Sequence, residues 1–99
     1  MDKIKCIYAI KDKRNDKVIY VGFTKNFKER KHRHFTDKKL HIDNYMFDEG
    51  RNNFLMIIIE EFNEDISKDD MKMKEQNYIE KFNTIKTGFN KRNSGNKNF

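Results

Sequence analysis

Two short apolar segments, each carrying a tyrosine, lie on either side of a polar turn near the start of this chain. Residues 4–11 contain the sequence CIYAI, residues 18–23 contain IYVGF, and DKRND separates the two segments. Two apolar segments around a polar turn are typical of a β-hairpin. Because neither segment alternates strictly between apolar and polar residues, we expect both faces of the resulting sheet to be covered.

The length of the turn decides whether Tyr8 and Tyr20 share a face of the sheet. Successive side chains of a strand point to opposite faces, so one residue more or less in the loop reverses the relation. An odd loop, for example residues 13–15 with Asn15 in a left-handed conformation, lets the two tyrosines face each other. An even loop places them on opposite faces, and the sequence leaves both arrangements open.

Four further elements are expected after the hairpin. Asn26 is a good N-cap residue, and Glu29 three residues later resembles a capping box, so a helix is expected over residues 27–38. A short helix is expected over residues 43–50, with Gly50 as its C-terminal stop. Residues 54–62, FLMIIIEEF, predict the strongest core strand. Ser67 then caps a longer helix that ends near Asn83.

This order of elements predicts an α+β fold, with a three-stranded, mainly antiparallel sheet flanked by helices. The chain has 99 residues, so we expect one domain, spanning residues 1–90. The last seventeen residues are polar and lack periodicity, which predicts a loop and, over residues 91–99, a polar tail.

The charge of the chain is distributed unevenly. The net charge is +6, but residues 1–42 carry 13 Lys/Arg against 5 Asp/Glu, whereas residues 43–70 carry 2 against 9. Residues 71–99 are basic again, with 7 against 2. Basic ends and an acidic middle favour a molecule with one side that faces a polyanion. Lys-rich surfaces are also common in soluble proteins, so charge alone leaves nucleic-acid binding and a merely solvated surface both open.

Cysteine usage and hydropathy predict where the protein works. Cys6 is the only cysteine, so it cannot form an internal disulfide, which favours a reducing compartment. The chain has no apolar segment of membrane-spanning length, and MDKIKC lacks a signal-peptide core. We expect a cytoplasmic protein without a membrane partner. The abundance of Lys, Asn, Ile and Phe is typical of an AT-rich genome such as a phage's, in which case the compartment is that of the host cell.

One carboxylate interrupts the apolar stripe of the last predicted helix. At 100° per residue, Met71, Tyr78, Ile79 and Phe82 share an arc, with Glu75 near its middle and Glu80 on the opposite side. An isolated buried charge is very costly, so Glu75 must be paired, protonated or bound to a metal. A structural ion pair with a lysine or arginine satisfies the same requirement.

The first predicted helix carries a cationic counterpart. Phe27, Arg30 and His34 share one face, so Arg30 and His34 point inward with the phenylalanine. A solvated basic face explains the remaining polar residues of this helix, and His32 and His41 are treated as surface residues. Neither a CxxC nor an HExxH pattern is present, so a structural zinc site is not expected.

Taken in order, these residues resemble the GIY-YIG nuclease family. CIYAI with Tyr8 and IYVG with Tyr20 match the two tyrosine motifs, and four further positions follow in the family's order: Arg30, His34, Glu75 in KEQNYIEKF, and Asn90 in TGFNKR. The resemblance covers nearly the whole chain, from about residue 4 to residue 90. Cysteine replaces the first glycine of the motif and Val21 replaces its second isoleucine, and both changes are mild.

The resemblance implies a divalent-metal-dependent endonuclease that hydrolyses phosphodiester bonds in DNA, with RNA not excluded. Glu75 is then the ligand of Mg²⁺ or Mn²⁺, Arg30 holds the phosphate, and Tyr8 positions or deprotonates the attacking water. Tyr20, His34 and Asn90 complete the catalytic set. A phenolate needs a nearby cation, for which Lys25 is a candidate, and Gly22 lets the substrate or the following helix approach the backbone closely. Nucleic-acid contacts are expected from Lys25, Lys28, Arg33, Lys91 and Arg92.

Two other functions compete with this one. A catalytically idle module that binds nucleic acid or a protein partner does not require the retained catalytic set. A purely structural basic domain leaves Glu75 unexplained. For the nuclease, we expect low intrinsic sequence specificity, because the chain has no room for a separate DNA-reading domain. One small site cuts one strand per encounter, and the sequence does not decide between monomer and homodimer.

Overall fold

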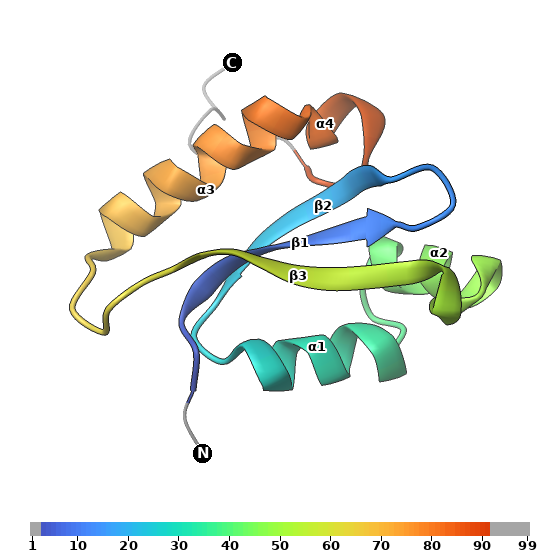
Figure 1. Ribbon diagram of the computed structural model, residues 1–99, viewed down its shortest axis with the longest axis horizontal. Coiled ribbons are helices and arrows are strands. Elements are labelled where there is room, and N and C mark those ends of the chain that lie inside the picture. The colour runs from blue at the N-terminus through green and yellow to red at the C-terminus, as the bar shows by residue number, and fades with distance from the viewer. Residues whose placement is uncertain (1–2, 92–99) are drawn as a thin grey trace.

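A computed structural model describes residues 3–91 of the chain. Within these residues, three strands and four helices are arranged in layers, with the sheet between α1 (Phe27–Thr36) and α2 (His41–Glu49) on one side and α3 (Lys68–Phe82) on the other (Figure 1). In chain order the elements are β1 (Cys6–Asp12), β2 (Lys17–Thr24), α1 (Phe27–Thr36), α2 (His41–Glu49), a 3₁₀ turn (Arg51–Asn53), β3 (Phe54–Glu61), α3 (Lys68–Phe82) and α4 (Thr84–Thr87).

The sheet is antiparallel throughout, in the order β2-β1-β3. The central strand β1 is buried along almost its whole length, because helices cover both of its faces. The near-continuous apolar sequence of β1 is therefore explained by burial on both faces of the sheet, as expected. The predicted α+β class with a three-stranded sheet and flanking helices is confirmed.

A β-bulge places Tyr8 and Tyr20 on the same face. The loop between the strands has four residues, since Asp12 pairs with Lys17, and an even loop alone would separate the two side chains. The register shifts where Lys11 pairs with Val18 but Ile10 pairs with Tyr20, so Ile19 is the extra residue. The left-handed residue of the turn is Asp16, with φ of 62°, rather than Asn15.

The helix ends follow their local signals closely. The Asn26 side chain accepts a hydrogen bond from the Glu29 amide, and the Ser67 side chain accepts one from the Asp70 amide. Gly50 ends α2 with φ of 101°, which a glycine adopts without strain.

Several predicted boundaries are wrong by one or two residues, among them that of the first strand, which begins at Cys6 rather than at residue 4, and one element was missed. Helix α1 ends at Thr36 rather than at residue 38, α2 begins at His41 rather than at residue 43, and β3 ends at Glu61 rather than at residue 62. The short helix α4 occupies part of the segment predicted as loop. Residues 92–99, most of the predicted tail, lie outside the described part of the chain.

Two apolar clusters hold the layers together. Tyr8, Ile10, Ile42 and Met46 belong to the cluster under α1 and α2. On the other face, Ile7 and Val21 pack against residues of α3, among them Ile79 and half-buried Tyr78 and Phe82. The stripe predicted for this helix is thus confirmed. Over residues 3–91, no helix combines the length and the apolar character needed to cross a membrane.

Candidate active site

The Tyr8 hydroxyl lies directly over Gly22 of the neighbouring strand. The two residues pair across β1 and β2, and the Tyr8 side chain is fully buried. A Cβ atom added at Gly22 would lie 2.4 Å from both Cζ and Oη of the tyrosine. From the sequence, Gly22 was expected to let the substrate or the following helix approach the backbone closely. The structure corrects that assignment, because the phenol itself fills the space above Gly22.

A hydrogen-bonded chain of side chains begins at this hydroxyl. Tyr8 Oη lies 2.8 Å from Nε2 of His34, a buried residue of α1, and His34 Nδ1 lies 2.6 Å from Oδ1 of Asp43 in α2. Arg30 Nη1 donates to Tyr8 Oη at 3.4 Å and to the Phe23 carbonyl at 3.3 Å. The inward face predicted for Arg30 and His34 is therefore present.

Burial keeps the central members of this chain neutral. Desolvation raises the pKa of the Tyr8 phenol, and the charge of Glu75 adds to the rise, while the hydrogen bond and charge of Arg30 oppose it. Desolvation lowers the pKa of His34, opposed by the Asp43 carboxylate. At neutral pH, Tyr8 is thus a phenol and His34 a neutral imidazole. The cation at the phenol is Arg30, whereas Lys25 is exposed and does not act on the Tyr8 pKa.

Tyr20 completes an aromatic triangle with Tyr8 and His34. Its ring centroid lies 6.2 Å from that of Tyr8 and 5.6 Å from that of His34, edge-on to the imidazole. Burial and the charge of Glu75 raise the pKa of its phenol. Tyr20 is half-buried and lines a pocket of about 380 Å³, so it is more open to solvent than Tyr8.

Glu75 approaches the same phenols from α3, on the other side of the sheet. Its carboxylate is half-buried and lines a hollow of about 340 Å³ with Phe23, Met71 and Lys72. Desolvation raises the Glu75 pKa, and the charges of Lys72 and Arg30 oppose the rise. None of the ion pairs found among residues 3–91 includes Glu75, whereas Glu80 is exposed, as its position on the helix predicts.

Asn90 is bound to the edge of β2. Its side-chain oxygen accepts from the Val21 amide at 2.8 Å, and its amide nitrogen donates to the Val21 carbonyl at 2.8 Å. The Phe89 amide also donates to the Ile19 carbonyl at 2.7 Å. Both polar groups of the Asn90 side chain are thus used in fixing the strand between Tyr20 and Gly22.

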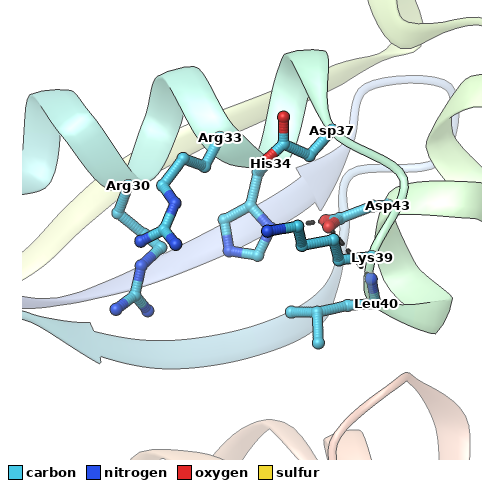
Figure 2. Close-up of a pocket in the computed structure, with 7 residues that line it drawn as sticks. All are labelled: Arg30, Arg33, His34, Asp37, Lys39, Leu40 and Asp43. Carbon is cyan, nitrogen blue, oxygen red and sulfur yellow. Dashed lines mark hydrogen bonds and ion pairs between the residues drawn. The ribbon is translucent and has the colours of Figure 1, made fainter.

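Most of the predicted nucleic-acid contacts are exposed side chains, and two of them, Arg33 and Lys91, line pockets shared with residues of the site. Arg33 lines a pocket of about 200 Å³ together with Arg30, His34 and Asp43, which Figure 2 shows between α1 and the start of α2. The other described members are also exposed, namely Lys25, Lys28 and Lys91. Arg92 lies outside the described residues.

Sequence reasoning missed one residue here, and a second, His41, lies where it was predicted but lines a pocket of the site. Asp43 was treated as the start of a helix, although its carboxylate is buried against His34. An acidic residue in the first turn of a helix has an ordinary capping role, so nothing in the sequence pointed to the imidazole. His41 is exposed like His32, but it lines the same pocket as Tyr20 and Asn90.

The site thus combines a buried phenol against an imidazole, an arginine at the phenol, and a glutamate across the strand edge. The chain matches the family model of the GIY-YIG catalytic domain over residues 4–93 and belongs to the GIY-YIG family. It is therefore a nuclease, of the endonuclease type.

Two solved structures agree with this assignment. The catalytic domain of the intron endonuclease I-TevI, as an E75A mutant, is 29% identical, with a TM-score of 0.76 over 92% of this chain and 96% of that chain. The catalytic domain of the homing endonuclease I-TevI is 30% identical, with a TM-score of 0.75 over 90% of this chain and 99% of that one. A search of curated proteins found no significant match.

Proposed function

We propose that this nuclease is a divalent-metal-dependent endonuclease that hydrolyses phosphodiester bonds in DNA with low intrinsic sequence specificity. The observation that carries the proposal is the 2.8 Å contact between Tyr8 Oη and His34 Nε2, made at the atom that Arg30 also contacts. A folding core needs neither an imidazole nor a guanidinium at a buried phenol. A site that moves a proton next to a phosphate uses both.

Tyr8 and His34 supply the base in this proposal. A phenol whose pKa is raised is not ionised at rest, so Tyr8 cannot act as a preformed phenolate. It accepts a proton from the attacking water as it passes its own proton to Nε2 of His34. The net result is a hydroxide at the phosphorus and an imidazolium at His34. Tyr20, 5.6 Å from the imidazole ring, belongs to the same proton network.

Arg30 binds the phosphate. Its guanidinium is half-buried beside the phenol, and its Nη1 is held by Tyr8 Oη and the Phe23 carbonyl. A guanidinium fixed in this way presents its remaining N–H groups in a set direction, which suits bidentate contact with phosphate oxygens. Arg30 therefore places the phosphorus next to the hydroxyl of Tyr8.

Glu75 is the proposed ligand of Mg²⁺ or Mn²⁺. Within the described residues no three His, Cys, Asp or Glu side chains gather into a complete metal site. A single carboxylate suffices for Mg²⁺, which keeps several waters and takes phosphate oxygens as its other ligands. Glu75 fits that role, because it is half-buried and belongs to none of the ion pairs among the described residues. The metal, when bound, neutralises charge on the phosphate and stabilises the leaving 3′ oxygen.

Asn90 acts as a positioning residue, because its side chain holds the strand that carries Tyr20 and Gly22. The exposed cations bind the DNA backbone on either side of the cut: Lys25, Lys28, Arg33 and Lys91, with Arg92 proposed alongside them. Contacts to phosphate carry no sequence information, which supports low specificity.

Incubation of the protein with supercoiled plasmid and with single-stranded RNA, in Mg²⁺ or in EDTA, tests the proposal. We expect nicked plasmid to appear first, only with the metal, and the RNA to remain intact. Glu75→Ala should abolish cleavage while Glu80→Ala, on the exposed side of the same helix, leaves it unchanged. A protein that binds DNA but cuts neither substrate under any condition is the idle binding module, and the proposal is then wrong.

A further inference from the structure

Asp43 is a buried carboxylate without a permanent cation as its partner. Two acidic residues are buried among residues 3–91, Asp12 and Asp43, each about 3% exposed. Asp12 is paired with the guanidinium of Arg14 at 3.0 Å. Asp43 instead contacts His34, whose pKa is lowered and which is neutral at pH 7. Burying a carboxylate against a neutral ring lowers the stability of the fold. We therefore look for a functional reason for this contact.

The two oxygens of Asp43 are both used as acceptors. Oδ1 lies 2.6 Å from His34 Nδ1, and Oδ2 accepts from the Leu40 amide at 3.2 Å; Figure 2 shows both contacts. A carboxylate cannot donate, so the ring nitrogen that faces it must carry the proton. The other ring nitrogen, Nε2, is then unprotonated and points at the Tyr8 hydroxyl 2.8 Å away.

We infer that Asp43 is a positioning residue for the reaction: it fixes His34 in the Nδ1–H tautomer and stabilises the imidazolium that forms when Nε2 takes the Tyr8 proton. This inference rests on the proposed function, in which His34 receives that proton. In the opposite tautomer Nε2 carries a proton and has no lone pair for the phenol. The relay then cannot begin.

The charges around His34 explain why a carboxylate is needed there. Arg30 and Arg33, on the same helix, both disfavour an imidazolium, and Asp43 opposes them. Lys39 and Asp37 also line the pocket, and the Tyr8 and Tyr20 rings face the imidazole from the sheet. Of these groups, Asp43 is the carboxylate in direct contact with the ring. If Asp43 had only a structural role, accepting the hydrogen bond from the Leu40 amide at the start of α2 would be sufficient.

Asp43→Asn is the decisive variant, because asparagine has the same shape but one acceptor fewer. It cannot accept from both His34 Nδ1–H and the Leu40 amide, and it carries no charge to stabilise an imidazolium. Asp37→Asn is the matched control: it removes a carboxylate from the same pocket, and within residues 3–91 the Asp37 side chain forms one hydrogen bond, which it accepts from Thr36 Oγ1 at 3.4 Å.

The experiment combines single-turnover cleavage of DNA with ¹⁵N NMR of the imidazole, the His34 signals being assigned as those lost in His34→Gln. We expect the wild type and Asp37→Asn to show the Nδ1–H tautomer and similar rates. Asp43→Asn should bind DNA as the wild type does but cut it about 100-fold more slowly, within the range for loss of acid–base assistance. A slower rate with unchanged binding separates positioning from a loss of folded protein.

Two results would overturn the inference. One is an Nε2–H tautomer of His34 in the wild-type protein. This measurement needs no variant, so it tests the inference even if Asp43→Asn fails to fold or the wild type does not cut DNA. The other is a rate for folded Asp43→Asn within a few-fold of the wild type. A third result separates the two claims: the wild type does not cut DNA, but its His34 is the Nδ1–H tautomer and Asp43→Asn abolishes that tautomer. This result would contradict the proposed function and support the positioning of His34 by Asp43.

Discussion

Replacing Gly22 by alanine should force the Tyr8 ring out of its place. The added Cβ would lie 2.4 Å from Cζ and Oη of Tyr8, whereas ordinary contacts are 3.4–4 Å, so the ring must move by about 1 Å. Overpacking of this kind costs roughly 1–3 kcal/mol. The bond to His34 Nε2 breaks as well, at a further cost of about 1 kcal/mol. The total of roughly 2–4 kcal/mol corresponds to a fall in Tm of about 8–32 °C for a domain of this size.

Thermal unfolding of a double-mutant cycle with Tyr8→Leu measures this effect. Leucine keeps the position apolar but lacks the atoms that the new Cβ would meet. We therefore expect Gly22→Ala to cost little in the Tyr8→Leu background, where glycine in a strand has no advantage over alanine. An equal loss of stability in both backgrounds would show that Gly22 serves something other than the Tyr8 side chain.

Two further predictions concern charge. Burial raises the pKa of Glu75 above its ordinary 4.5, so the ionised carboxylate destabilises the folded protein. This destabilisation is absent below pH 4.5 and grows as the pH rises through the pKa of the folded state. Without metal, Glu75→Gln should raise the Tm at pH 7 but not at pH 4, and the exposed Glu80→Gln should do neither; equal effects at both pH values refute this. Lys25→Ala and Lys28→Ala should each lower the slope of log Kd against log salt by about 0.9 per lost phosphate contact. Lys17→Ala, at the hairpin turn, should leave the slope unchanged.

Local signals predicted the elements of this fold well. The caps at Asn26, Ser67 and Gly50 involve residues within one turn of each other, so their side chains and backbone conformations determine the helix ends directly. The apolar segments of the strands are long enough to identify the sheet. Helix α4 was missed because it has four residues, too few to show a periodic pattern.

Contacts between distant segments were harder to predict. Whether the two tyrosines share a face depends on a bulge at Ile19, which the sequence of the turn does not reveal. Asp43 lies nine residues after His34, across a loop, and meets it only because α1 and α2 pack side by side. The Asn90 side chain bonds to Val21, 69 residues earlier, and no local pattern specifies such a pairing.

The candidate catalytic residues were chosen from the resemblance and from two local patterns. The inward face of the first helix indicated Arg30 and His34, and the interrupted apolar stripe indicated Glu75. Both patterns are properties of a single helix, and the burial of these residues agrees with them. The roles of all six candidates in cleavage stay predictions, those of Arg30, His34 and Glu75 as much as those of Tyr8, Tyr20 and Asn90.

The single-turnover rate of Tyr8→Phe, measured with enzyme in excess over DNA, tests the central claim that a buried phenol carries out the chemistry. Phenylalanine keeps the ring and its packing, and removes only the hydroxyl that contacts His34 and Arg30. We expect a folded protein that binds DNA as the wild type does, because Arg30 and the basic surface remain. Its cleavage rate should fall by at least about 100-fold, the lower end of the cost of losing a general base. A rate within a few-fold of the wild type would remove Tyr8 from the mechanism and leave His34 as the base.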